Sequence, residues 1–213
     1  MPVSAQTLHD EQIWVNTTAI GSVKDRLVYF AEVQGRGGTA PRQFRQLLLR
    51  PAIGWRLSDR FTAYMGYARV VTDTGDAAET NEDRLFQQLN WTIGSVGTAA
   101  ISSRTRLEER WRNDGSDMGL RLREMIRVAV PVSTTASGRP ARALAWSETF
   151  IALNDTDWKV TSGFDQQRSF IGAELPILKR STLEIGYLNQ IVRIPTGGQR
   201  MNHTLSVTFF LRT

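Results

Sequence analysis

Arginine recurs at alternate positions in two neighbouring parts of the sequence, and the first part also contains a glutamate in the same alternation. Arg104, Arg106 and Arg110 share this spacing with Glu108, and a second row begins at Arg121. Residues two apart lie on one face of a β-strand, so each row presents its charges together. Guanidinium groups held in this way can pair with carboxylates or bind anions, because their planar donors match both. The candidate site comprises Arg50, Arg84, Arg104, Arg106, Glu108, Arg110, Arg121, Arg123, Arg127 and Glu148.

The composition narrows the chemistry further. The 213-residue chain has no cysteine and only two histidines, His9 and His203, which leaves little material for a metal centre or a nucleophilic site. Its net charge is +5, and only three of the 26 basic residues are lysine. Arginine is preferred in enclosed ion pairs and anion sites, whereas solubilising surfaces carry more lysine. We therefore expect the positive charge to lie at specific sites, and we expect no cofactor.

Catalytic arrangements are hard to build from these residues. His203 and Ser206 are three apart, hence on opposite faces of one strand, so they do not form a hydrolytic pair. Glu148 with Asp165 or Glu184 is the one acid–base pair worth considering, and its more ordinary role is to neutralise arginines. We expect a protein that is not an enzyme.

The elements that must position these charges are β-strands. From Gln12 onward, roughly eleven segments alternate apolar and polar residues between turn-forming clusters. This regular spacing predicts an all-β, antiparallel, up-and-down barrel. Bacterial membrane barrels usually have an even strand number, so we expect about 10–12 strands, with 12 preferred. The segments are residues 12–21, 25–35, 43–57, 60–72, 83–95, 97–112, 118–131, 141–154, 159–174, 180–193 and 200–212.

Each segment has one apolar and one polar face. In residues 43–57, Leu49, Ile53 and Trp55 share one parity, whereas Arg50 has the other. This pattern fits an outer-membrane barrel with lipid outside, and it also fits a soluble lipocalin-like binder of a small molecule with the apolar face inside. The long segments, and connections that divide into short and long, favour the membrane barrel. We expect the bacterial outer membrane as the location and its lipid as a partner.

Aromatic residues fall near segment ends or on the apolar face, as the interfacial girdles of membrane barrels require. We therefore expect them on the outside of the barrel, at its two interfaces with water. The residues concerned are Trp14, Tyr29, Trp55, Phe61, Trp91, Trp111, Trp146 and Tyr187.

The arginine rows then face the lumen, where like charges on adjacent strands repel by up to ~1 kcal/mol per pair. Two arrangements offset this repulsion. In the first, the arginines interlock with Glu108, Glu148 and Glu184 into ion-paired layers that brace the wall. In the second, a narrow anion-preferring channel remains and selects small acidic solutes. We expect bracing, in a barrel of unassigned physiological role, and keep the channel as the alternative.

Two other interpretations of the basic residues carry less weight. The arginines are dispersed over alternating strands with no arm, helix or aromatic platform, so no nucleic-acid partner is expected. The segment Gly35-Arg36-Gly37-Gly38 has the composition of an anion-binding nest, but no strand-to-helix context follows it. We interpret this segment as a loop.

The chain is expected to form one domain, because its length suits a single barrel. Val3, Ser4 and Ala5 have the small-residue spacing of a signal-peptidase site. Residues 1–9 are therefore interpreted as an N-terminal segment left by a signal peptide, and residues 10–213 as the barrel.

An ordered set of short motifs runs through roughly residues 10–212. The motifs are Leu49-Arg50-Pro51, Gly66-Tyr67, Arg84-Leu85-Phe86-Gln87-Gln88-Leu89, Arg104-Thr105-Arg106-Leu107-Glu108-Glu109-Arg110, Arg121-Leu122-Arg123, Ser147-Glu148-Thr149-Phe150, Leu153-Asn154-Asp155, Gly163-Phe164-Asp165-Gln166-Gln167-Arg168, Gly186-Tyr187-Leu188-Asn189-Gln190 and Asn202-His203. In this order they resemble the bacterial family known as domain of unknown function 2490. The resemblance implies an outer-membrane-type barrel from a Gram-negative bacterium, and it implies no activity.

Overall fold

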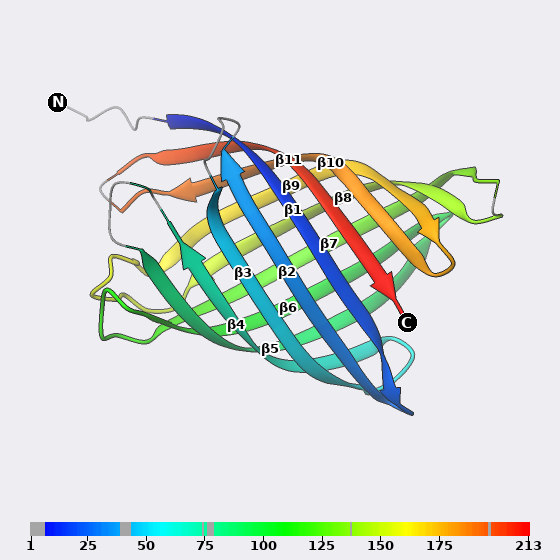
Figure 1. The fold of residues 1–213 in the computed structure, drawn as a ribbon, viewed down its shortest axis with the longest axis horizontal. Coiled ribbons are helices and arrows are strands. Elements are labelled where there is room, and N and C mark those ends of the chain that lie inside the picture. The colour runs from blue at the N-terminus through cyan, green and yellow to red at the C-terminus, as the bar shows by residue number, and fades with distance from the viewer. Residues whose placement is uncertain (1–6, 39–43, 74, 76–78, 137, 196) are drawn as a thin grey trace.

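The computed structural model describes residues 7–38, 44–73, 75, 79–136, 138–195 and 197–213. In these residues eleven strands close into one barrel (Figure 1). Their bounds are β1 (Thr7–Lys24), β2 (Leu27–Gly38), β3 (Phe44–Arg56), β4 (Phe61–Thr72), β5 (Thr80–Val96), β6 (Ala99–Arg112), β7 (Gly119–Thr134), β8 (Pro140–Ala152), β9 (Gly163–Leu178), β10 (Ser181–Arg193) and β11 (Gln199–Arg212). No helix in the described residues is long and apolar enough to cross a membrane.

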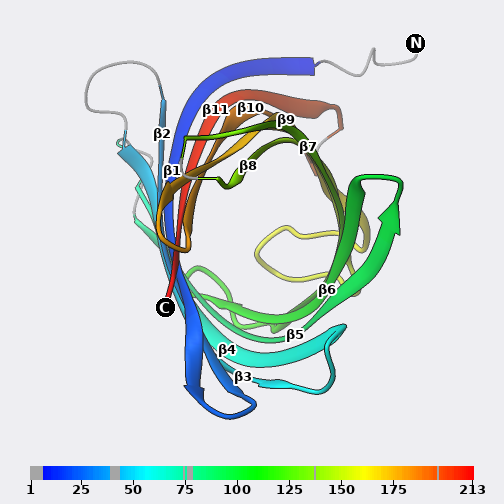
Figure 2. The same cartoon turned by 90° about the vertical axis from the view of Figure 1, so that its right-hand side faces the viewer.

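The barrel closes between its first and last strands. Neighbouring strands are antiparallel throughout the sequence order, but β1 and β11 pair in parallel, from Thr7 opposite Gln199 to Ile20 opposite Arg212. This seam follows from the odd strand number, because the first and last strands of an odd up-and-down barrel run in the same direction. Both strands lie side by side in Figures 1 and 2.

The predicted fold class is therefore confirmed, with two differences in detail. The strand number lies within the expected range but is eleven, not the preferred twelve. The seam is parallel, whereas an antiparallel barrel was expected throughout. The preference for twelve came from the even numbers of bacterial barrels, and alternation within each strand carries no information about how the ends of the sheet meet.

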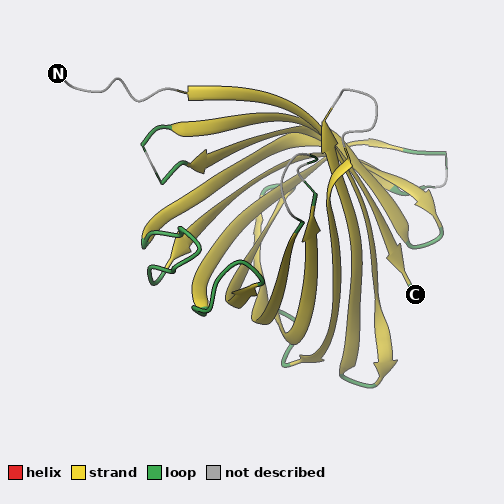
Figure 3. Cartoon of the chain, turned by 60° about the vertical axis from the view of Figure 1, so that its left-hand side comes forward, coloured by secondary structure: helices red, strands yellow, loops and turns green. Residues whose placement is uncertain are grey.

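The connections differ between the two ends of the barrel (Figure 3). We call one end the turn end, where the connections are residues 25–26, 57–60, 97–98, 135–139 and 179–180. At the opposite end, here the loop end, they are residues 39–43, 73–79, 113–118, 153–162 and 194–198. As expected, the connections divide into shorter and longer ones, with the shorter ones at the turn end and the longer ones at the loop end.

Two stretches of chain are strands where the sequence indicated otherwise. Gly35-Arg36-Gly37-Gly38, interpreted as a loop, is the end of β2, where Arg36 pairs with Trp14 of β1 and Gln46 of β3. The absence of side chains on three of these residues concealed the alternation. Strand β1 begins at Thr7, within the predicted N-terminal segment, and residues 1–6 of that segment lie outside the described residues.

The two faces of the strands point as the alternation predicts. Ile53 and Ile171 are 55% and 66% exposed on the outside, whereas Arg50 and Arg123 are 5% and 4% exposed on the inside. A slip of one residue in any strand would exchange these faces, so the register is strongly specified. Large apolar side chains therefore lie on the outer surface, and the buried charged side chains lie inside.

One part of the interior is apolar. Trp14, Leu144, Phe170 and Leu188 are at most 5% exposed and pack together, with Trp146 stacked on Phe170 at 5.3 Å between ring centroids. Gly186 lies beside this cluster, where a Cβ atom would stand 2.7 Å from the Phe170 ring. The cluster fills one side of the lumen.

Trp14 and Trp146 were expected in the outer girdles, and that prediction is wrong for both. Each shares the parity of inward polar residues, Trp14 with Thr18 and Trp146 with Glu148. Four others lie on the outside of the barrel, as expected, and are 37–49% exposed: Trp55, Trp91, Trp111 and Tyr187.

Candidate functional site in the barrel lumen

All ten candidate residues lie on the inner wall, on β3 and on β5 to β8. Eight are buried, and the side chains of Arg104 and Arg127 are 24% and 25% exposed. The two arginine rows are direct neighbours, because Glu108 of β6 lies opposite Arg121 of β7. The fold thus brings together charges that the sequence showed on separate segments.

Two carboxylates hold the centre of this set. Glu108, 1% exposed, accepts hydrogen bonds from Arg121 and Arg123, each at 2.6 Å. Glu148, 2% exposed, accepts hydrogen bonds from Arg104 and Arg123, each at 2.8 Å. Arg123 therefore bridges the two carboxylates. Charge-assisted bonds of this kind are about twice as strong as neutral ones.

Two further carboxylates hold the remaining arginines near the loop end. Glu32 accepts a hydrogen bond from Arg50 at 2.9 Å. Glu82 accepts one from Arg84 at 2.8 Å and one from Arg110 at 2.5 Å. Neither acid was predicted from the sequence, although Glu82 shares the parity of Arg84 two residues later. Glu32 is recognisable only once its cross-strand position opposite Arg50 is known.

Arg127 lies toward the turn end with its own acids. Its guanidinium donates to Glu174 at 2.7 Å and to Glu184 at 2.6 Å. Glu184 was expected among the acidic partners, whereas Glu174 was not. In the described residues no group of three or more His, Asp or Glu side chains is placed to hold a metal ion. The inner carboxylates are engaged by arginine.

Aromatic rings separate the layers of charge. The Arg106 guanidinium lies 4.6 Å from the centre of the Phe86 ring. The guanidinium carbons of Arg123 and Arg168 lie 4.3 and 4.6 Å from the centre of the Phe150 ring. Such contacts are worth up to about 2 kcal/mol where water is excluded. The lumen is packed by stacked guanidinium and aromatic planes as well as by ion pairs.

The connection of residues 153–162 contributes Trp158 to the loop end. This ring is 4% exposed and lies 5.0 Å from the guanidinium of Arg110 and 5.1 Å from that of Arg112. Its indole nitrogen donates to the backbone oxygen of Asp117 at 2.9 Å. Figure 2 shows this connection within the outline of the barrel. The connection therefore narrows the opening at the loop end.

A carboxylate ties this connection to the next one. Asp157 accepts hydrogen bonds from the backbone N–H and the hydroxyl of Ser116, both at 2.8 Å, and from the backbone N–H of Asp117 at 3.2 Å. These donors favour the ionised carboxylate, so the Ser116 amide in particular lowers the pKa of Asp157. The connections 113–118 and 153–162 thus form one linked rim.

Two cavities meet near the middle of the lumen. The vestibule, of about 540 Å³, opens toward the loop end and is lined by residues such as Arg84, Arg110 and Gln166. The inner chamber, of about 160 Å³, lies toward the turn end and is lined by residues such as Arg127, Trp146 and Glu184. Five residues line both cavities and form a waist between them: Trp14, Arg36, Arg50, Arg123 and Arg168.

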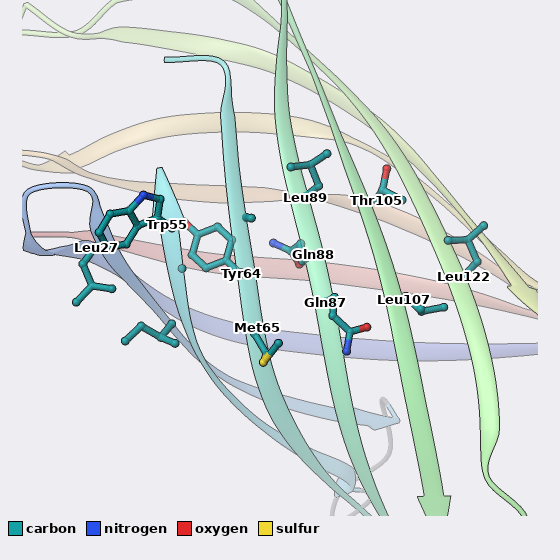
Figure 4. Close-up of a pocket in the computed structure, with 13 residues that line it drawn as sticks. Leu27, Trp55, Tyr64, Met65, Gln87, Gln88, Leu89, Thr105, Leu107 and Leu122 are labelled. Carbon is teal, nitrogen blue, oxygen red and sulfur yellow. The ribbon is translucent and has the colours of Figure 1, made fainter. Parts of the chain in front are cut away.

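The outer wall carries an apolar groove of about 700 Å³ across β2 to β7 (Figure 4). Its lining includes Leu27, Trp55, Met65, Leu89 and Leu107, which come from five different strands. Met65 is 65% exposed. The groove is therefore a surface that suits hydrocarbon.

Polar groups on the outer wall bond to one another across strands. Glu124 accepts hydrogen bonds from Ser103 and, at 2.5 Å, from Thr105. Gln167 accepts one from Thr149 at 2.5 Å. Glu124 and Gln167 both lie in the half of their strands nearer the loop end. These outward polar side chains are thus paired across neighbouring strands.

Comparison with known proteins gives the following. A family described as "Protein of unknown function (DUF2490)" matches residues 11–202. An uncharacterized protein of Methylorubrum extorquens is 49% identical over 210 residues, which cover 98% of this chain and 90% of the relative. No solved structure matches the chain.

The first prediction concerns the centre of the ion network. Glu108→Gln keeps the shape of the side chain but leaves Arg121 and Arg123 without one of their carboxylates. Breaking a buried ion pair by removing one partner costs about 3–5 kcal/mol. Urea unfolding of the refolded protein in nonionic detergent should show a loss of that order.

Glu109→Gln is the matched control for this change. Glu109 is the next residue of β6, faces outward and makes only a 3.5 Å contact with Gln87. We expect this variant to lose less than about 1 kcal/mol, as exposed polar contacts do. Equal losses for the two variants would contradict the enclosed network.

The second prediction concerns the linked rim. A carboxylate whose pKa is lowered in the folded protein stabilises its contacts at pH values above its ordinary pKa. This stabilisation is lost as the pH falls through the lowered pKa. In a pH titration, the amide NMR signals of Ser116 and Asp117 should therefore shift with a midpoint below about pH 3.9, which is the ordinary pKa of aspartate. Asp157→Asn should abolish the transition. A midpoint at or above the ordinary value would show that the carboxylate is not held by these donors.

Proposed function

Because the chain belongs to the DUF2490 family of proteins of unknown function, whose name supplies no activity, we propose its role from the lumen and the outer wall. The protein is a bacterial outer-membrane barrel with no enzymatic activity. Its arginine–glutamate network braces a wall that is closed at the waist.

The proposal rests on one observation: the apolar faces of the strands point outward and the charged faces point into the lumen, the reverse of a soluble barrel. Large apolar side chains cover the outside, among them Val132 at 65% and Leu178 at 65% exposed, while Arg106 and Glu108 are 1% exposed inside. Soluble monomers rarely expose contiguous apolar patches larger than a few hundred Å². A hydrocarbon environment removes the free-energy cost of exposing this apolar surface to water. A lipocalin-like binder would need the opposite arrangement.

The turn-end half of the barrel supplies the apolar band. On β7 the outward residues there are Ile126, Val128, Val130 and Val132, with no polar residue among them. Membrane strands need about 9–11 residues. The strands are 12–18 residues long, so each can span a bilayer and extend beyond it.

The paired polar groups on the outer wall fit this placement. Glu124 lies between Ser103 and Thr105, which donate to it. A charged or polar residue on the lipid face costs most at the bilayer midplane and little near an interface. The position of Glu124 nearer the loop end therefore supports an interfacial depth.

The interior supports a bracing role because its central carboxylates are engaged by arginines. Glu108 and Glu148 are each shared by at least two arginines, and Arg123 joins them. The acids that could otherwise act as a general acid or base, Asp165 and Glu184, accept hydrogen bonds from arginines at 3.0 and 2.6 Å. No pair of carboxyl groups is left to transfer protons among these residues.

A second candidate function is a narrow anion-preferring channel. The observation that favours it is the lining of the vestibule, which includes ten arginines and one acidic residue, Glu82. A surplus of enclosed positive charge raises the local concentration of anions. The waist decides between the two candidates, because it separates the vestibule from the inner chamber.

The third prediction tests the membrane placement. The full chain, refolded into phosphatidylcholine vesicles, should resist carbonate extraction and should migrate differently with and without heating in mild detergent. Closed barrels resist unfolding by detergent, so heating changes their mobility. A folded protein that stays dissolved in detergent-free buffer would instead indicate the soluble binder.

The fourth prediction tests the closed waist. In planar bilayers the wild-type protein should give no steady current steps, whereas Trp14→Ala, which removes the indole from the waist, should give anion-selective steps. Trp111→Ala, on the outer wall, is the control and should remain silent. Steady anion-selective steps from the wild-type protein would favour the channel over the brace.

A further inference from the structure

Besides the exposed Arg200, the vestibule contains two guanidinium groups that form no ion pair with a carboxylate of the described residues. Arg36 donates only to the amide oxygens of Gln34, at 2.5 and 2.9 Å, and of Gln46, at 2.8 Å. Arg168 is 9% exposed, forms no salt bridge, and its Nε atom has no hydrogen-bond partner. The other arginines of the waist, Arg50 and Arg123, are bound to glutamates.

Both groups lie against the same ring. The guanidinium carbon of Arg36 is 4.1 Å from the centre of the Trp14 ring, and that of Arg168 is 5.0 Å from it. Two like charges are thus held close together in a partly desolvated place. This arrangement costs free energy, since burial penalises unpaired charge and the two charges repel.

The nearby acids are already committed. Glu148, directly opposite Arg168 on β8, accepts hydrogen bonds from Arg104 and Arg123. Glu32, on the same strand as Arg36, accepts one from Arg50. Gln190, the partner of Arg168 on β10, is neutral and donates to Gln166 at 2.6 Å. The protein therefore offers this pair of cations hydrogen-bonding amides but no available negative charge.

We infer that the vestibule binds a tetrahedral dianion of the phosphate type at Arg36 and Arg168, next to Trp14. A dianion neutralises both charges, and its several oxygens can accept the paired N–H donors of two planar guanidinium groups. A monocarboxylate would neutralise only one. Amide side chains from Gln46 and Gln166 in the lining can hydrogen-bond the rest of a phosphorylated solute.

The size of the cavity agrees with a small ligand. Its volume of about 540 Å³ falls within the range of about 300–1,000 Å³ that small-molecule sites occupy. The inference deepens the proposed function, since it rests on the folded barrel and assigns a ligand class to its lumen. It does not require that the barrel conduct.

The test uses inorganic phosphate as the probe at pH 8, with the full chain refolded in dodecyl maltoside. Isothermal titration calorimetry should detect binding of phosphate, and acetate should bind at least tenfold more weakly. Phosphate should also raise the temperature of unfolding, because a ligand that binds only the folded state stabilises it.

Arg168→Gln and Arg36→Gln should each weaken phosphate binding at least tenfold. Arg168→Lys keeps the charge but loses the paired donors, and should give an intermediate affinity. Arg142→Gln is the matched control, since Arg142 bonds to Glu174 and lines neither cavity. It should bind phosphate within twofold of the wild-type protein.

A folding check accompanies each variant. Without phosphate, Arg168→Gln should unfold at the same temperature as the wild-type protein or at a higher one, because it removes an unpaired buried charge. Failure of the wild-type protein to bind either inorganic phosphate or a short-chain phosphatidic acid, or unchanged binding in Arg168→Gln, would overturn the inference. Neither result would affect carbonate-resistant insertion into vesicles, so failure of the site and failure of the membrane proposal are distinguishable.

A second titration distinguishes free phosphate from a lipid headgroup. A short-chain phosphatidic acid carries the same phosphate group on a lipid. Binding of inorganic phosphate alone, dependent on Arg168, identifies a soluble ligand, whereas binding of phosphatidic acid alone, with the same dependence, identifies a headgroup. Both results support the site, and binding of neither compound overturns it.

Discussion

Enclosure of charge is the constraint on which the barrel depends. Glu108 and Glu148 are buried as carboxylates, and moving such a group out of water costs several kcal/mol unless hydrogen bonds and opposite charges compensate it. Arg123 supplies compensation to both, with Arg121 and Arg104 completing the set. The network joins β6, β7 and β8, so the same contacts that satisfy the charges also hold the wall.

The enclosed network and the apolar exterior are two results of one alternation. Since successive side chains of a strand point to opposite faces, each arginine inside places a neighbouring residue outside. In β7 those neighbours are leucine, isoleucine and valine over most of the strand. The interior is then filled by rings and guanidinium planes, and the waist around Trp14 divides what space remains. Within this packed lumen, Arg36 and Arg168 differ from the other arginines of the waist, because amide groups and aromatic rings contact them and no carboxylate in the described part of the chain forms an ion pair with them.

The sequence was sufficient for the fold class, the two faces of the strands and ten of the charged residues of the inner wall. It was insufficient for the seam, because the parallel pairing of β1 with β11 joins segments at opposite ends of the chain. Trp14 and Trp146 were wrongly expected on the outside, because their aromatic character was given more weight than their position in the alternation of the strand. Glu32 and Glu174 were missed because their partners come from other strands, and Arg36 was hidden by the flanking glycines. Arg168 appeared only within a family motif, since its lack of an acid is a property of the assembled lumen.

The central claim is that the outer face of each strand meets hydrocarbon. The absence of cysteine from the chain allows a single nitroxide label to be attached at Ile171→Cys on the outer face of β9, with the protein in phosphatidylcholine vesicles. The account predicts that the label's relaxation is accelerated strongly by oxygen, which concentrates in the bilayer, and weakly by a water-soluble nickel chelate. Strong relaxation by the nickel chelate together with a weak oxygen effect would place this face in water and contradict the account.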